Sequence, residues 1–300
     1  MSLPHHHLRF LLLLPVLIAL ATAQDNCPDA SEIVYSPFKP WFQFDYPLGG
    51  ADCWTGAICT LGQADAARNQ QFAATALVMG ILPIILRDIA WPARRVVIVS
   101  ARLPALVEVL VRALGLDPMV LGNVSGWDEG DVRRWIQWVR TSPIASAGVK
   151  SRLVIRILVA VSCFVLLISY AALALIEIYS KRTALGCVYP VITLTWCILG
   201  LAPAAVHVLF KNYRMNRNAR KEDNSSGRAS AVQGADEAWP VQFAWAIYYI
   251  VGTLVFTSIM AITPLELFVW VVVMSAVTGA SKLLALYVCL MLRNPVNADN

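Results

Sequence analysis

The residues best suited to chemistry in this chain are three cysteines near its N-terminus. Cys53 and Cys59 bracket a tryptophan and a glycine in ADCWTGAICTLG, residues 51–62, and Cys27 precedes them. A C-x5-C spacing is not the C-x-x-C of a redox enzyme, and a zinc site needs a fourth ligand. In an oxidising compartment the three cysteines predict a disulfide. The preferred pairing is Cys27–Cys59, then Cys27–Cys53, then Cys53–Cys59, and the remaining thiol is free or bridges two protomers of a homo-oligomer.

Four ionisable residues lie within or at the ends of apolar stretches: Glu177, His207, Glu266 and Lys282. Ionisable groups are costly in a bilayer, so each is a candidate functional residue. Lys282 either snorkels toward the inner headgroups or pairs with a carbonyl or polar group in a cavity of the bundle. His207 is the only histidine beyond residue 23, so a histidine-dependent hydrolase or a histidine-rich metal site has one candidate. No phosphate loop, dinucleotide fingerprint or hydrolase motif occurs. We therefore predict no catalytic residue, metal or cofactor.

Composition indicates the elements that must position these residues. The chain has 300 residues, of which 58% are hydrophobic and only 14% are charged, whereas about a quarter of the residues of a soluble domain are charged. This balance excludes a soluble enzyme of this length and predicts several membrane spans. Because a backbone in lipid must satisfy its own hydrogen bonds, the spans are expected to be helices. The predicted fold class is all-α, a polytopic membrane helix bundle.

The N-terminus has the pattern of a secretory signal peptide. Arg9 precedes an apolar run from Phe10 to Leu20, which is too short to span a bilayer comfortably, and Ala21-Thr22-Ala23 follows. Small residues at this spacing predict cleavage after Ala23. The mature N-terminus then lies outside the cell or in the lumen, where disulfides form.

Five apolar segments are long enough to be spans. The spans cover residues 70–90, 153–179, 187–210, 241–262 and 265–292. Before this helix bundle, at 70–292, we predict a signal peptide at 1–23 and an ectodomain at 24–69. Cytosolic loops are predicted at 91–152 and 211–240, and a cytosolic tail at 293–300.

Residues 96–116 are apolar but carry Arg102, Glu108 and Arg112. Each charge costs roughly 2.5 to 3.5 kcal/mol at the bilayer centre. We therefore expect a surface-lying or re-entrant helix here, with an i,i+4 pair between Glu108 and Arg112, and not a sixth span.

The charges support this topology. With residue 24 outside and five spans, most of the 24 lysines and arginines fall in the two cytosolic loops, as the positive-inside rule requires. The C-terminus is then cytosolic. The sequons at Asn123 and Asn224 would also be cytosolic and unmodified, whereas a glycosylated Asn224 would favour six spans.

The segment SGWDEGDVRRWIQWVR, residues 125–140, predicts an amphipathic helix. Val132, Trp135, Ile136 and Val139 follow the i, i+3, i+4, i+7 spacing of one helix face. Such a helix suits the headgroups of anionic inner-leaflet lipids, or it packs on the cytosolic face of the protein itself. Nucleic-acid binding is not expected, because the arginines are few and the surrounding chain is apolar.

The order of features resembles uncharacterised multi-pass membrane proteins of filamentous fungi. The resemblance rests on the secreted start, DCWTGAIC, VMGILPIIL and SARLPALVEVLVRALGLDP, and covers about the first 120 residues. It implies a membrane location, and no activity or functional residue follows from it.

The function expected from the sequence is that of a non-enzymatic integral membrane protein of the secretory pathway or plasma membrane that interacts with other molecules. The lipid bilayer is its expected partner. The alternative is a transporter or channel subunit, for which Lys282→Met would abolish flux.

Overall fold

A computed structural model describes residues 27, 29–38, 51–85, 96–120, 129–143, 145–146, 151–180, 189, 191–218, 238–258, 261–292 and 294. The predicted signal peptide, the ectodomain residues 39–50, both sequons, most of the 211–240 loop and nearly all of the tail lie outside these residues. The side chains of Cys53 and Trp54 also lie outside the description.

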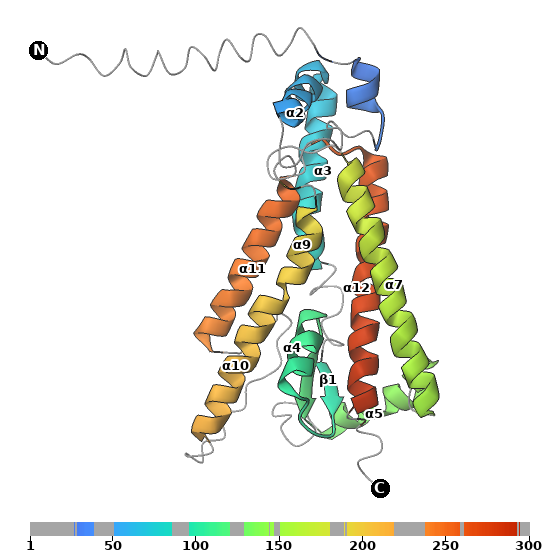
Figure 1. Ribbon diagram of the computed structural model, residues 1–300, viewed down its shortest axis with the longest axis vertical. Coiled ribbons are helices and arrows are strands. Elements are labelled where there is room, and N and C mark those ends of the chain that lie inside the picture. Colours follow the sequence, from blue (N-terminus) through green and yellow to red (C-terminus); the bar gives the residue numbers. More distant parts are fainter. Residues whose placement is uncertain are drawn as a thin grey trace, which may run out of the picture. The chain divides into compact units, whose positions relative to one another are not determined.

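The described residues are mostly helical (Figure 1). In chain order the elements are the π-helix η2 (Ser31–Tyr35), α2 (Ala51–Gln63), α3 (Ala66–Ile84), β1 (Val96–Val99), α4 (Ala105–Ala113), β2 (Asp117–Val120), α5 (Glu129–Thr141), α7 (Arg152–Tyr179), α9 (Ile192–Leu199), α10 (Leu201–Asn218), α11 (Trp239–Thr257) and α12 (Pro264–Leu292). The chain divides into two compact units: unit 1 comprises Met1–Met79, Leu175–Ile192 and Val255–Val269, and unit 2 comprises the remaining residues.

Four helical segments among the described residues are long and apolar enough to cross a membrane: Arg152–Tyr179, Ile192–Asn216, Trp239–Thr257 and Pro264–Leu292. They correspond to four of the five predicted spans, and they make the chain compatible with a membrane protein. The second of these segments is broken by a turn at Gly200, between α9 and α10. Pro203 follows that turn, and its missing N–H explains why the helical hydrogen bonds are interrupted there.

The first predicted span, residues 70–90, is helical as α3 from Ala66 to Ile84. It is not among the four described segments that are long and apolar enough to cross a membrane. Its first turns carry Arg68, Asn69 and two glutamines, which dilute the apolar stretch that follows.

Residues 96–116 differ from the single helix expected from the sequence. Val96–Val99 forms β1, Ala105–Ala113 forms α4, and Asp117–Val120 forms β2, which pairs with β1 in parallel. Four consecutive β-branched residues favour a strand, and all four are buried. The helical interpretation was wrong for residues 96–99, because an unbroken apolar run does not distinguish a buried strand from a helix. It was confirmed for α4, which also contains the predicted i,i+4 pair between Glu108 and Arg112.

This βαβ unit packs against the helices of unit 2. Val97, Val99 and Val111 share one apolar cluster with Ile155 of α7 and Leu286 of α12. In the same unit α4 lies along α10 (Figure 1). The loop that the sequence places between spans is therefore part of the folded helix bundle.

Candidate functional site

The four ionisable residues singled out by the sequence fall in different units. Glu177 and Glu266 belong to unit 1, and His207 and Lys282 belong to unit 2. All four residues are buried, and none exposes more than 9% of its surface. Because burying a charge is costly unless it is paired, the surroundings of each residue limit what it can do.

A group of buried charges connects α4, β2 and α10 in unit 2. We call it the charge cluster; its members are Glu108, Arg112, Asp117, His207 and Lys211. Arg112 donates to Glu108 Oε1 from Nη2 at 3.0 Å and from Nε at 3.1 Å. On its other side, Arg112 Nη1 lies 2.5 Å from Asp117 Oδ1.

The helix α10 completes the cluster from the facing side. Lys211 Nζ lies 2.6 Å from Glu108 Oε1, so a single carboxylate oxygen contacts cations from two helices. His207 Nδ1 lies 3.4 Å from Arg112 Nη1. His207 therefore lies next to a guanidinium.

Local sequence spacing produces this arrangement. Glu108 and Arg112 on α4, and His207 and Lys211 on α10, are each four residues apart and so share a helix face. After α4 the backbone turns at Gly115, which has a φ of +93°, a conformation that glycine adopts readily at helix ends. The turn brings Asp117, the first residue of β2, back to Arg112.

Within the cluster the carboxylates of Glu108 and Asp117 face the cations of Arg112 and Lys211. Arg112 exposes 3% and Glu108 6% of its surface, so the charges compensate one another inside the protein. Removing one partner of a buried ion pair typically costs about 3–5 kcal/mol, because a charge is left uncompensated. The arrangement holds α4 against α10.

Lys282 lies on a small cavity in unit 2. The cavity has a volume of about 40 Å³ and is lined by residues of α4, α7, α9 and α12, including Ser281, Thr278 and Tyr170. Such a volume accommodates water, whereas small-molecule sites are roughly 300–1,000 Å³.

The Lys282 side chain also reaches the end of α4. Its Cε would lie 3.6 Å from a Cβ added to Gly115. A cation at this place is favoured by the negative end of the α4 dipole. Lys282 is thus buried beside a cavity of the bundle, and its pairing with a polar group or its snorkelling to the headgroups stay the two predictions.

Glu266 is buried at the start of α12 in unit 1, where it accepts backbone hydrogen bonds. Its Oε2 accepts from the N–H of Thr263 at 2.7 Å, and its own N–H donates to Thr263 Oγ1 at 3.3 Å. These two bonds form a capping box. Its Oε1 accepts from the N–H of Phe38 at 2.8 Å, so the same carboxylate also fastens the N-terminal segment. Glu177, fully buried near the end of α7, lies in the same unit.

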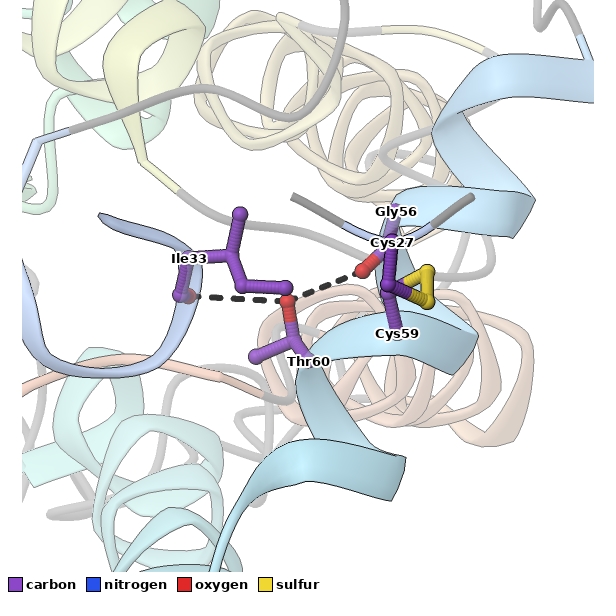
Figure 2. Close-up of a disulfide and its surroundings, with 5 residues drawn as sticks. All are labelled: Cys27, Ile33, Gly56, Cys59 and Thr60. Atoms are coloured by element: carbon purple, nitrogen blue, oxygen red, sulfur yellow. Dashed lines mark hydrogen bonds between the residues drawn. A yellow bond between two sulfur atoms is a disulfide. The ribbon is translucent and has the colours of Figure 1, made fainter. Parts of the chain in front are cut away.

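Cys27 is bonded to Cys59, the first of the three pairings weighed (Figure 2). Next to it, the hydroxyl of Thr60 donates to the carbonyl of Gly56 at 2.8 Å and lies 3.5 Å from that of Ile33. Cys59 and Ile33 share an apolar cluster with Phe72 of α3. The disulfide thus joins the N-terminal segment to α2, and its role is structural.

The predicted amphipathic helix is observed as α5. Val139 is fully buried, Trp135 is partly buried against the same cluster of unit 2, and Val132 and Ile136 lie partly covered on this face. This packing agrees with the second interpretation of the segment, in which it rests on the protein itself.

Two features of these sites were missed in the sequence. The capping box is visible locally as Thr263-Pro264-Leu265-Glu266, with a proline in the first helical position. By contrast, nothing local connects Asp117 or Lys211 to Arg112. Their meeting depends on the fold of the βαβ unit against α10.

Comparison with protein families, curated proteins and solved structures found no match to this chain. The resemblance to fungal membrane proteins therefore stays a prediction.

Proposed function

We propose that this chain is a five-span integral membrane protein with a non-enzymatic, interacting role. The observation that carries the proposal is a stripe of large apolar side chains along α7. Exposed side chains at helical spacing form this stripe: Leu153, Ile157, Val161, Phe164, Ile168 and Leu175. At about 1.5 Å per residue, the 28 residues of α7 exceed the roughly 30 Å of a hydrocarbon core. Lipid is the solvent that suits such a face.

The fifth span in this proposal is α3. Its C-terminal half exposes Leu77, Val78, Ile81 and Ile85, which water would not favour. Counting α3 also preserves the charge asymmetry, because it places both arginine-rich loops on the cytosolic side. The N-terminus, after removal of residues 1–23, is then outside or luminal, and the C-terminus is cytosolic.

A non-enzymatic role is supported by the state of the buried charges. The charges of Glu108, Arg112 and Lys211 compensate one another, and the carboxylate of Glu266 accepts hydrogen bonds from backbone N–H groups. A catalytic acid or base would need an orientation toward a substrate, whereas these groups bind helices together.

One observation favours the alternative of a transporter or channel subunit, namely the cavity beside Lys282. Ionisable residues on intramembrane cavities often mark transport pathways. Flux assays of reconstituted protein would separate the two functions. We expect no difference between the wild type and Lys282→Met beyond stability, whereas loss of a flux in the variant would establish transport.

Glycosylation mapping tests the proposed topology. An acceptor sequon introduced between residues 39 and 50 should be modified, while Asn224 in the same chain should remain unmodified. Modification of Asn224 would contradict the five-span arrangement. Mass shifts that disappear on deglycosylation provide the measurement, and removal of Asn224 by Asn224→Gln is the matched control.

A further inference from the structure

Two arginines lie at the point where the apolar stripe of α7 begins. Arg152 and Arg156 are exposed and four residues apart, so they share one helix face. Leu153 and Ile157, the first members of the stripe, follow each of them directly and are also exposed. A helix that changes from exposed arginine to exposed leucine within one turn places its arginines at the level of the headgroups.

The helix α5 adds further arginines to the same part of unit 2. Arg133, Arg134 and Arg140 are exposed and lie outside the helix face that carries the buried Val139. Val139 belongs to the same apolar cluster as Ile155 of α7, so α5 and the first turns of α7 border one cluster. Figure 1 shows α5 beside the end of α7 at which Arg152 lies.

We propose that these five exposed arginines form a binding surface for the phosphate groups of anionic phospholipids. We call it the arginine surface: Arg133, Arg134, Arg140, Arg152 and Arg156. A guanidinium presents a planar fork of N–H donors that matches a phosphate. This inference rests on the proposed membrane location.

The neighbouring apolar stripe selects lipid over other phosphate compounds. A phospholipid bound to Arg152 or Arg156 can lay its acyl chains along Leu153 and Ile157, whereas a free anion or a nucleic acid gains nothing from those side chains. The arginines therefore face the phosphate of a phospholipid, and the apolar side chains beside them face its acyl chains. The packing of α5 on the protein itself is retained, because the exposed arginines lie outside the face that carries Val139.

Lipid binding to the purified full-length chain tests the proposal. Native mass spectrometry in detergent would follow titrations with phosphatidylserine and with phosphatidylcholine. We expect tighter binding of phosphatidylserine. Because each basic residue near an anionic surface contributes about 1 kcal/mol, each arginine removed should weaken this binding about fivefold, and Arg140→Gln/Arg152→Gln/Arg156→Gln roughly a hundredfold.

Two variants control for folding and for charge. Arg102→Gln removes an exposed arginine outside the arginine surface and should bind phosphatidylserine as the wild type does. Arg140→Lys/Arg152→Lys/Arg156→Lys retains the charges and should keep most of the preference. The melting temperature of each variant in phosphatidylcholine nanodiscs identifies any that fails to fold.

Three results would overturn the inference: equal affinity for the two lipids, equal binding by the triple glutamine variant and Arg102→Gln, or displacement of phosphatidylserine by inorganic phosphate or a short RNA at comparable concentration. Alkaline carbonate extraction separates this failure from that of the proposed function. A chain that stays in the membrane without lipid preference contradicts only the arginine surface, whereas an extracted chain contradicts the membrane location itself.

Discussion

Glu108 and Glu266 are both buried carboxylates at helix contacts, yet they are compensated in different ways. Glu108 in unit 2 faces the side chains of Arg112 and Lys211, whereas Glu266 in unit 1 faces the backbone N–H groups of Thr263 and Phe38. A cation removed from Glu108 leaves a buried charge unpaired. The partners of Glu266 belong to the main chain, and substitutions other than proline leave these N–H groups in place. The same residue type thus makes one contact fragile and the other robust.

The largest effect that sharpens this comparison is expected for Arg112→Met. The substitution leaves Glu108 and Asp117 without their shared guanidinium, so the free energy of unfolding should fall by about 3–5 kcal/mol. Thermal unfolding in nanodiscs measures the loss. Arg102→Met, at an exposed position, is the matched control. Equal effects of the two changes would contradict the stabilising role of the charge cluster between α4 and α10.

Loss of the disulfide should give the next largest effect. The disulfide and Glu266 both hold the N-terminal segment in unit 1, so removing the disulfide shows how much of that segment's stability Glu266 supplies. Cys27→Ser opens a loop with a sequence separation of 32 residues, which should cost about 3–4 kcal/mol of stability. Cys163→Ser, at a free cysteine, should change little. If Cys27→Ser is as stable as Cys163→Ser, then the capping box and the apolar cluster alone secure the N-terminal segment.

The two carboxylates can be compared directly by the same substitution. Glu266→Gln keeps one oxygen as an acceptor, but its amide NH2 group then faces one of the two backbone N–H donors. The free energy of unfolding should therefore fall by about 1–3 kcal/mol. Glu108→Gln should cost more, because it leaves two cations with one carboxylate. The measurement is the difference in melting temperature between the variants, and the reverse order would refute the comparison.

A smaller effect is expected where the backbone brings Asp117 to Arg112. Gly115→Ala imposes a side chain on a left-handed conformation, which costs roughly 1–2 kcal/mol. Gly62→Ala is the control, since Gly62 is in a helix with nothing within 4 Å of an added Cβ. That change should be neutral or stabilising, and an equal loss at both glycines would show that the turn carries no special constraint.

The parts of the fold that the sequence predicts correctly are helices whose apolar residues form a long local run or a periodic pattern. The helices at 152–179, 239–257 and 264–292 and the amphipathic face with Trp135 and Val139 agree with their sequence patterns. The strand at 96–99 was missed, because strand pairing with residues 117–120 depends on tertiary context.

The site shows the same division between local and distant information. The Glu108–Arg112 pair follows from helical spacing, and the place of His207 in an apolar stretch predicts a functional residue there. Lys211, however, is separated from Glu108 by 103 residues, and no local pattern joins them. The capping box at Thr263 and Glu266 is visible in the local sequence, since a threonine precedes a glutamate by three residues at the start of an apolar run.

Photo-crosslinking from α7 tests the central claim of a lipid-facing helix bundle most directly. Benzoylphenylalanine in place of Phe164, which exposes 64% of its surface, should crosslink to phospholipid in native membranes. The same group in place of Trp270, which exposes 1%, should crosslink within the protein. Mass spectrometry of the products distinguishes the two. Lipid adducts at position 164 alone are the predicted result, whereas crosslinks from position 164 to soluble proteins, or to a second copy of this chain in place of lipid, would contradict the account.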